Sequence, residues 1–342
     1  MFGLVFEFIL LFLLNLILGD VDNTTSIIFV APPTENNSYY FSKQTELYDY
    51  YAELINVVNT EPTNENEYIL ALVDEFGKNE LLNRGIDEKN IFVNEISEQL
   101  EDIWCRDFGT VQVDNTLYKF KYQPNYLNQS DAESTDNAFI HWLDYNEVDY
   151  TNIDIILDAG NFVFERNTKK MITTTRILDD NPTYTKTEMI NYLKTELNIN
   201  EIAIIEQEEN EATGHSDGMV TFINENVIGI NDFDKYSTLQ DFYNDIVDEL
   251  IDAFDDGQGS LNIIDLPYAP TDDTFGVFAS SKGIYTNILT GLYTQYSPTY
   301  SSTNGDDELN IEELEEWSAE NVNVKGVDAT DVSIMGGAVR CL

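Results

Sequence analysis

The stretch "NFVFERNTKKMITTTRI" (161–177) contains two apolar runs joined by a polar turn. This pattern predicts a β-hairpin. The segment that follows, 185–198, has apolar side chains at three- and four-residue spacing and Thr185 in the N-cap position, which predicts an amphipathic helix. The apolar run 201–207 then predicts a third strand. Residues 161–207 are therefore expected to form one unit of strand, strand, helix and strand.

The same order recurs along the chain. Hairpins are predicted with tips at Asp114-Asn115, at 224–226 and at 281–283, and an earlier strand, helix and strand are predicted within 26–73. The period is roughly 50 to 60 residues, which is typical of radial or stacked architectures. Such units placed about an axis would leave their helices outside and bring their inner strand ends together. We therefore expect an α/β propeller in one domain, residues 21–342, with a site at its axis.

The composition excludes some classes of partner. The 342 residues include 17 Lys and Arg against 63 Asp and Glu, a formal net charge of -46. Such a charge repels nucleic acid and anionic membrane surfaces and attracts guanidinium or amine groups. It is also typical of a solvated surface suited to high salt. The hydrophobic fraction of 42% is enough for a packed core, so the chain is expected to be globular.

The N-terminus carries a short apolar segment. Residues 8–18 are almost entirely apolar, but a membrane span needs roughly 20 such residues. The length is typical of the central region of a secretory signal, although Glu7 precedes it and no Ala-x-Ala site follows. We predict a signal peptide over 1–20, and hence a secreted protein with no membrane attachment after its removal. A membrane anchor and a buried helix remain alternatives.

Polar residues beside a glycine stand before each predicted hairpin. Asp and Gly are also ordinary hairpin residues, but the recurrence at corresponding positions indicates one site built from several units. The residues concerned are Asp107 before Gly109, Asp158 before Gly160, His215 and Asp217 before Gly218, and Asp272 and Asp273 before Gly276.

A thiol near the last residue of the sequence has a candidate partner. Cys341 follows Gly336 and Gly337, and a cysteine nucleophile needs an acid or base within reach. The chain has two histidines: His141, flanked by Ile140 and Trp142, is expected to be packed, which leaves His215 as the base. Cys341 could also be a structural thiol or pair with Cys105, the second of two cysteines.

The motifs "WCRDFG", "LDAGNF", "GHSDGMVTF", "GIYTNILTGLY" and "GGAVRC" occur in this order from residue 104 to 341. In order and spacing they resemble the agmatine deiminase and Porphyromonas-type peptidylarginine deiminase family, a guanidine-modifying group of the pentein superfamily. The resemblance covers the chain from about residue 26 to its end. It implies a five-bladed α/β propeller and a hydrolase that acts on a guanidinium substrate.

The resemblance also implies roles for particular residues. Cys341 would attack the guanidinium carbon, and His215 would protonate the leaving ammonia and later activate water. Asp107 and Asp217 would hold the guanidinium nitrogens, as suits a planar cation with a fork of donors. The remaining candidates for substrate binding are Trp104, Asp158, Asn161 and Asn287.

Three departures from the family pattern stand out. Arg340 occupies a position where agmatine deiminases tend to have histidine, in a Gly-Gly-Gly-Asn-x-His-Cys run. No proline follows Gly109, and Cys105 stands where other members carry a residue without a thiol. No calcium-binding loop with the pattern Asp-x-Asp-x-Asp-Gly is present, so neither a metal nor a cofactor is expected.

Three functions remain open. Export favours peptidyl arginine as the substrate, and the segment 122–139, expected to lie at the entrance, has no Arg or Lys to bind a free carboxylate. The first expectation is therefore a secreted peptidylarginine deiminase that forms citrulline and ammonia. The alternatives are an agmatine deiminase, which would form N-carbamoylputrescine, and an acidic binding protein with a degenerate site.

Overall fold

The computed structural model describes residues 26–60, 67–93, 100–209, 211–255, 257, 259–276 and 278–342. The predicted signal peptide, residues 1–20, lies outside them. Across these ranges the strands form five three-stranded sheets and one two-stranded ribbon. The predicted α/β class is confirmed. No helix in the described ranges combines the length and the apolar character that crossing a membrane would require.

The first sheet is entirely parallel. It contains β1 (Ser26–Val30), β2 (Glu67–Val73) and β3 (Ile91–Val93), and helices α2 (Gln44–Thr60) and α3 (Glu75–Asn83) connect them. Parallel neighbours need a crossover connection, so a helix follows each of the first two strands. The first unit is thus strand, helix, strand, helix and strand.

The other four sheets each combine an antiparallel hairpin with a third strand that returns parallel after a helix. Their elements are β4 (Val111–Val113), β5 (Thr116–Lys121), α5 (Gln129–Tyr145) and β6 (Thr151–Ile156); β7 (Val163–Glu165), β8 (Lys170–Thr174), α6 (Arg176–Asp180), α7 (Lys186–Leu197) and β9 (Glu201–Ile205); β10 (Val220–Asn224), β11 (Val227–Asn231), α8 (Gln240–Phe254) and β12 (Asn262–Leu266); and β15 (Leu289–Thr290), β16 (Thr294–Thr299), α9 (Asp306–Trp317) and β17 (Asn323–Asp328). The predicted repeat is confirmed in these four units.

Local sequence explains the units that were predicted best. Thr185 accepts a hydrogen bond from the backbone of Glu188, whose side chain bonds back to Thr185, so a capping box starts α7. The buried face of α7 is formed by Met189, Leu193 and Leu197. At the first hairpin tip Asp114 has a φ of 53°, a left-handed conformation that Asp tolerates in tight turns.

Short helical segments lie between the larger elements. They are the helix α4 (Cys105–Phe108) and the 3-10 helices η1 (Phe41–Lys43), η2 (Glu88–Asn90), η3 (Ala159–Asn161), η4 (Ser216–Gly218), η5 (Phe233–Lys235) and η6 (Ser333–Met335). Three of them, α4, η3 and η4, stand directly before the first strand of a hairpin.

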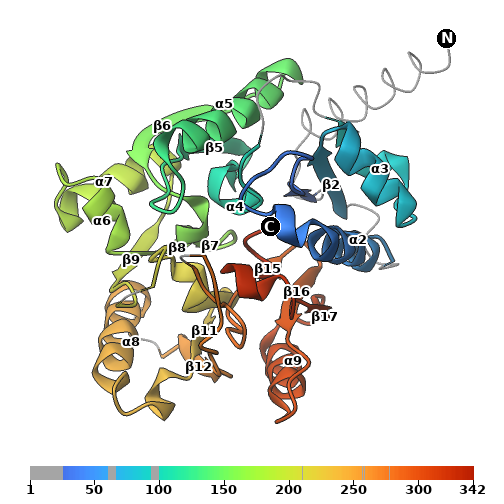
Figure 1. The fold of residues 1–342 in the computed structure, drawn as a ribbon. Helices are drawn as coiled ribbons and strands as arrows, with labels where there is room; N and C mark the ends of the chain where they lie inside the picture. Colours follow the sequence, from blue (N-terminus) through green and yellow to red (C-terminus); the bar gives the residue numbers. More distant parts are fainter. Residues whose placement is uncertain are drawn as a thin grey trace.

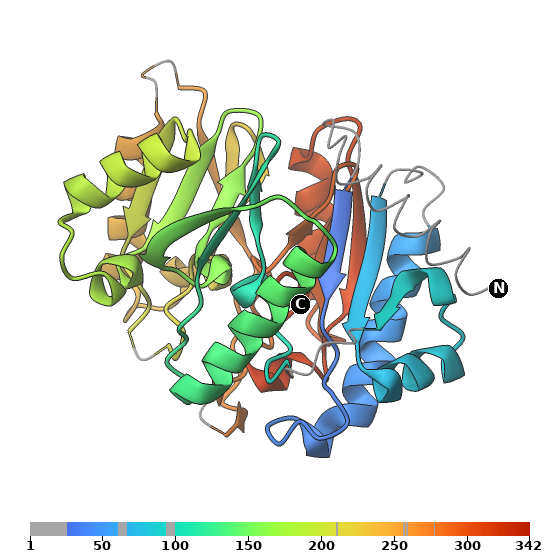
Figure 2. The ribbon, with the colours of Figure 1, turned by 90° about the horizontal axis from the view of Figure 1, so that it is seen from above.

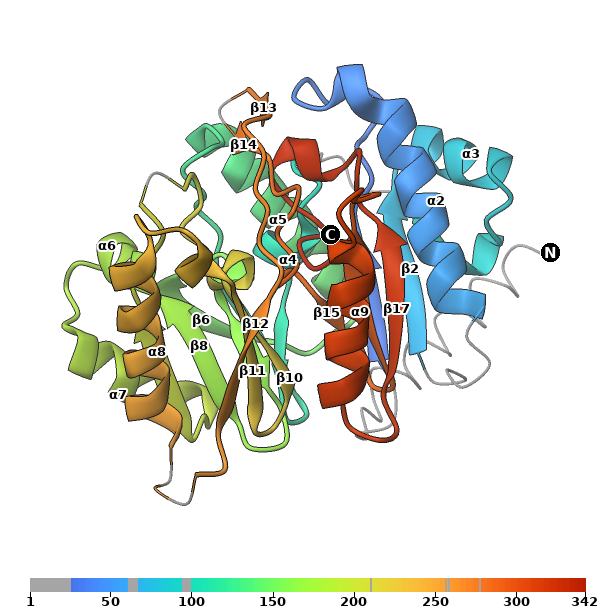
Figure 3. The same cartoon turned by 90° about the horizontal axis from the view of Figure 1, so that it is seen from below.

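The units follow one another around a common centre, with their long helices on the outside (Figure 1). Figures 2 and 3 show the strands of successive units side by side, flanked by those helices. Five apolar clusters among the described residues pack between units, each joining two consecutive ones. One of them joins the last unit to the first, because Leu54 and Ile55 of α2 share it with Tyr296 of β16 and Val327 of β17. Most of the core therefore lies between neighbouring units.

The prediction of the last hairpin was wrong. Its tip was expected at 281–283, but the hairpin of the fifth sheet pairs β15 with β16. The segment before it forms the small ribbon of β13 (Thr274–Phe275) and β14 (Phe278–Ala279). The backbone N–H of Ser281 donates to the carbonyl of Ser333 at 2.8 Å, so this segment is bound to η6. Buried polar side chains at Ser280 and Ser281 accompany that contact.

Two further expectations were wrong. His141 is exposed on α5, while its neighbour Trp142 is buried. Residues 129–139, expected in a loop at the entrance, form the first turns of α5. Asn128 caps this helix by accepting a hydrogen bond from the backbone N–H of Asp131, which starts it where a loop was expected.

Candidate active site

Three short helical turns bring the predicted acids together. Asp107 lies in α4, Asp158 stands at the N-cap position of η3 without a capping hydrogen bond from its side chain, and Asp217 lies in η4, whose N-cap residue is His215. The turn η3 is in contact with both α4 and η4, although the three belong to different units. These positions from different units thus lie close together, as expected for one polar site. His215 and Asp217 stand at the start of a 3-10 turn, where an extended strand was expected.

The fourth predicted position is not part of this group. Asp272 and Asp273 are exposed beside the β13–β14 ribbon, and neither lines the cavity described below. Their prediction followed from the misplaced last hairpin.

A turn carries Cys341, where a strand was expected. The segment after η6 folds back through turns, and the carbonyl of Cys341 accepts a hydrogen bond from the backbone N–H of Arg106 at 3.1 Å. Gly336 has a φ of 99°, which favours glycine. A Cβ on Gly337 would lie 2.5 Å from Trp104 Cζ3. The two glycines therefore let the backbone turn and pack against the indole.

A narrow cavity of about 60 Å³ connects these groups. That volume corresponds to about two water molecules or one small planar group. Six of the eight predicted site residues line it: Trp104, Asp107, His215, Asp217, Asn287 and Cys341. They come from chain segments that are more than two hundred residues apart at the extremes.

His215 lies between two acids. Its Nδ1 is 3.7 Å from Asp107 Oδ1 and its Nε2 is 3.5 Å from Asp158 Oδ2. Burial lowers the pKa of His215, but the charges of Asp107, Asp158 and Asp217 outweigh it and raise the pKa to about 10. These charges therefore favour the protonated imidazole.

Asp107 is in contact with two neighbouring segments. Its Oδ1 accepts a hydrogen bond from the backbone N–H of Gly160 at 3.1 Å, and its Oδ2 lies 3.2 Å from the hydroxyl oxygen of Tyr126. Burial, together with the charges of Asp158 and Asp217, raises the pKa of Asp107, while His215 opposes this shift. Gly160 permits this packing, since a Cβ there would lie 2.5 Å from His215 Nδ1.

Asn287 and Asp217 contact the thiol. Asn287 Nδ2 donates to Cys341 Sγ at 3.2 Å, and Sγ lies 3.9 Å from Asp217 Oδ2. Burial and the charges of Asp217 and Asp107 raise the pKa of Cys341 well above its usual range. This shift favours the thiol form.

Two predicted residues lie outside the lining. Asp158 stands on the far side of His215, and its Oδ1 is buried without a hydrogen-bond partner among the described residues. Asn161 is fully buried, and its Oδ1 accepts hydrogen bonds from the backbone N–H groups of Thr174 and Ser216 at 2.9 and 3.1 Å. Asn161 thus connects β8 to η4.

Five polar residues of the lining were not predicted as site residues: Tyr126, Glu208, Glu211, Thr213 and Ser281. Tyr126 donates to Asp102 Oδ2 at 2.7 Å as well as contacting Asp107. Glu208 and Glu211 lie in the loop between β9 and η4 and line the same cavity. Burial and the charge of Glu211 raise the pKa of Glu208, while a hydrogen bond from Tyr268 opposes this. The acidic run 206–211 was the available signal, but the high overall charge masked it.

Arg340 occupies the back of the site. Its Nη1 donates to Asp217 Oδ2 at 2.7 Å and to the carbonyl of Gly160 at 3.2 Å, and its Nη2 donates to the carbonyl of Phe162 at 2.7 Å. Its backbone N–H donates to Asn287 Oδ1 at 2.9 Å. The position that departs from the family pattern is thus bound to two of the predicted site residues.

Both cysteines are free thiols. Cys105 is buried, and burial raises its pKa to about 12, although Arg106 opposes the shift. A thiol in that environment is unreactive at neutral pH. The structure contains no Cys105–Cys341 disulfide.

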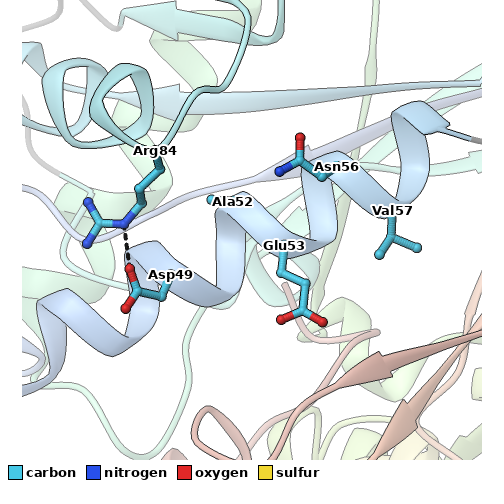
Figure 4. A pocket seen from close by; sticks show the side chains of 6 residues that line it. All are labelled: Asp49, Ala52, Glu53, Asn56, Val57 and Arg84. Carbon is cyan, nitrogen blue, oxygen red and sulfur yellow. Dashed lines mark hydrogen bonds and ion pairs between the residues drawn. The ribbon is translucent and has the colours of Figure 1, made fainter.

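A larger hollow of about 420 Å³ lies elsewhere, on the outer face of α2 (Figure 4). Arg84 and Asp49 face each other there, with Nε 2.7 Å from Oδ1, and Glu53, Asn56 and Val57 lie along the helix. None of the predicted site residues lines this hollow. The chemistry predicted from the sequence therefore belongs to the smaller cavity.

Comparison with solved structures shows a shared fold. The agmatine deiminase of C. jejuni matches 93% of this chain and 92% of its own, with 19% identity and a TM-score of 0.74. The agmatine deiminase of Enterococcus faecalis has the same coverage, 16% identity and a TM-score of 0.71. DDAH from Pseudomonas aeruginosa matches 92% of this chain and 96% of its own, with 11% identity and a TM-score of 0.53. The fold is thus that of pentein deiminases.

Sequence comparison gives the family. A search of curated proteins gave no match. The model of one protein family matches residues 22–342, which is almost the whole chain. On this match, the chain belongs to the Porphyromonas-type peptidyl-arginine deiminase family.

Proposed function

We propose that this protein hydrolyses a guanidinium group to a ureido group and ammonia, with Cys341 as the nucleophile. The observation that supports it is the gathering of a thiol, an imidazole and two carboxylates around one cavity of about 60 Å³. Cys341, His215, Asp107 and Asp217 all line that cavity. Membership of the deiminase family agrees with this chemistry.

The two acids would bind the substrate cation. A guanidinium group is planar and permanently charged, and carboxylates accept its N–H groups in short, directional hydrogen bonds. Asp107 and Asp217 line the cavity together with His215 and Cys341. A bound cation would also offset the negative charge that raises the pKa of Cys341, and so favour the thiolate when substrate is present.

The proposed reaction has two halves. The thiolate of Cys341 forms a bond to the guanidinium carbon, and the proton of His215 passes to a nitrogen of the adduct, so that the C–N bond breaks and ammonia leaves. Water then adds to the carbon of the S-linked thiouronium, and His215 accepts its proton. The C–S bond then breaks as the remaining hydroxyl proton passes to solvent, and the products are a ureido compound and the regenerated thiolate.

The lining favours a substrate with a second cation. Glu208 and Glu211 add two carboxylates to the cavity, and among the described residues that line it there is neither Lys nor Arg. Agmatine carries an amine at the end opposite its guanidinium, and free arginine carries a carboxylate that these acids would repel. We therefore place agmatine first as the substrate, ahead of peptidyl arginine.

Peptidyl arginine is the second candidate. An internal arginine residue presents no carboxylate at the cavity, and the net charge of -46 attracts cationic peptides. Secretion would favour peptidyl arginine as the substrate. We propose that residues 1–20 are a secretion signal. Sequencing the N-terminus of the protein exported by the native cell tests this, and an intact residue 1 on exported protein would contradict it.

One assay separates the candidates. The full chain is incubated with agmatine, with a peptide that has an internal arginine, and with free arginine, and ammonia and the ureido product are measured. We expect turnover of agmatine above that of the peptide, and none with Cys341→Ser. A peptide preference would reverse our order. A haloacetamidine probe that adds no mass to the terminal peptide, together with no turnover and retained guanidinium binding, would support a non-catalytic binding protein.

Glu208 offers a sharper test of the substrate. A charged hydrogen bond contributes about 1.5–3 kcal/mol, so Glu208→Gln should raise KM for agmatine at least about tenfold with little change for the peptide. The matched control is Glu209→Gln, since Glu209 is an exposed neighbour that does not line the cavity. Equal KM values in the two variants would remove the assignment of the amine to this part of the cavity.

We also propose that the five units close into a five-bladed propeller. The cluster that joins α2 to β16 and β17 supports this, because it packs the last unit against the first. A crystal structure in which these two units are apart would contradict it.

A further inference from the structure

One carboxylate oxygen lies between a buried guanidinium and the thiol. Asp217 Oδ2 accepts a hydrogen bond from Arg340 Nη1 at 2.7 Å, and the same atom is 3.9 Å from Cys341 Sγ. Arg340 does not line the cavity, so it approaches the carboxylate from behind. Only about a tenth of its side chain is exposed.

Three acceptors fix the direction of this guanidinium. Besides Asp217, the carbonyls of Gly160 and Phe162 bind it, at 3.2 and 2.7 Å. Both carbonyls belong to the turn η3 and its end, which lies next to His215. Arginine suits this place because its planar fork can donate to several acceptors at once and is always charged. A buried charge held by three bonds and adjacent in sequence to a nucleophile has a larger effect than one exposed to water.

Asn287 links the backbone of Arg340 to the sulfur. Its Oδ1 accepts from the N–H of Arg340, and its Nδ2 donates to Sγ. Movement of Arg340 would therefore displace the thiol as well as the charge on Asp217.

We propose that Arg340 is a positioning residue that stabilises the thiolate of Cys341 by neutralising Asp217 at the oxygen facing the sulfur, and that leaves Oδ1 of Asp217 for the substrate. This inference rests on the proposed function, in which Cys341 reacts as a thiolate. It assigns a role to the residue that replaces the histidine of related sequences.

The charges around the thiol explain why the thiolate would need Arg340. Burial and the charges of Asp217 and Asp107 raise the pKa of the thiol, and among the described residues the other basic groups near it are His215 and Arg106. Burial and the charge of Arg340 lower the pKa of Arg106 to about 10. The titratable and charged groups that face Cys341 are Asp217, Asp107, His215, Arg106, Arg340, Tyr50 and Tyr300. Without Arg340, Asp217 would act on the sulfur as an uncompensated negative charge.

The test is the rate of Cys341 alkylation by iodoacetamide as a function of pH, followed by mass spectrometry of the terminal peptide so that Cys105 does not interfere. Arg340→Gln should shift the alkylation midpoint upward by about one to two pH units, as expected for the loss of an opposite charge. It should lower kcat/KM at pH 7 about 10- to 100-fold, and the loss should shrink as the pH rises. Arg340→Lys should retain a midpoint close to that of the unaltered protein.

A matched control is Arg84→Gln, which removes an Arg–Asp contact of the same 2.7 Å length far from the cavity (Figure 4). It should leave the alkylation midpoint unchanged. Folded Arg340→Gln with an unshifted midpoint would overturn the proposal, even if turnover were lost. Alkylation of Cys341 does not require turnover. If the unaltered protein showed no turnover but Arg340→Gln still shifted the alkylation midpoint, the result would support this inference and count against the proposed function alone.

A third variant serves if Arg340→Gln does not fold. Arg340→His places a group with an ordinary pKa near 6.5 at the same position. The alkylation profile should then gain a second step as this histidine loses its charge. A profile without that step would overturn the proposal.

Discussion

Gly160 offers the most direct test of the site geometry. Its backbone does not have a positive φ, so alanine is compatible with the main-chain conformation. A Cβ there would lie 2.5 Å from His215 Nδ1 and 2.6 Å from Asp107 Oδ1, and the side chain of either partner would have to move by about 0.9 Å to reach ordinary contact. The substitution Gly160→Ala thus perturbs two proposed reacting groups and little else.

The expected effect is large on activity and moderate on stability. A misplacement of about 1 Å costs on the order of 100-fold in rate, which corresponds to about 2.7 kcal/mol of transition-state stabilisation. Overpacking of this kind lowers the free energy of unfolding by about 1–3 kcal/mol. We therefore expect Gly160→Ala to remain folded at 25 °C with kcat/KM about 100-fold lower. Ammonia release measures activity, and urea unfolding followed by circular dichroism measures stability.

The matched control is Gly326→Ala in β17, where the new Cβ would lie 2.9 Å from Thr299 Cγ2 and outside the cavity lining. It should lose a similar amount of stability and keep its activity while folded. If Gly160→Ala retained the kcat/KM of the control, His215 and Asp107 would not be the groups that act on the substrate.

Three further predictions follow from the site. The pKa of His215 is raised from 6.5 to about 10, so its contribution to stability should be complete below pH 6.5 and disappear as the pH rises towards 10. The free energy of unfolding in urea, measured across this pH range, should lack that dependence in His215→Asn. Cys341→Ser should abolish ammonia release and still bind agmatine in calorimetry, whereas loss of binding would assign the thiol to substrate affinity. Cys105→Ser should react with iodoacetamide at the terminal peptide as fast as the unaltered protein, and a slower reaction would show that Cys105 acts on Cys341.

Local patterns explain why most of the fold was predictable. The unit at 161–207 carries its own hairpin turn, capping box and apolar helix face, all of which lie within that one stretch of sequence. The last hairpin lacks such signals, since β15 is two residues long and β16 contains Pro298, which weakens a strand pattern. The polar segment before it was mistaken for the hairpin because its contacts are made with η6, some fifty residues away.

Only those residues of the candidate site that stand in short sequence motifs could be predicted from the sequence. Short motifs identified Asp107, His215 and Asp217, and each stands in a turn that begins a unit. The bond from Arg340 to the carbonyl of Gly160 spans 180 residues of sequence, and no local pattern indicates it. Glu208 joins the cavity for the same reason, through the placement of a whole loop.

The apolar clusters lie between units, while the proposed reacting groups come from the turns of different units. Small slippage of any one sheet against its neighbour would therefore spread the reacting groups apart before strands or helices melt. At low urea concentrations the protein should lose its activity while its far-ultraviolet circular dichroism spectrum stays that of the intact fold.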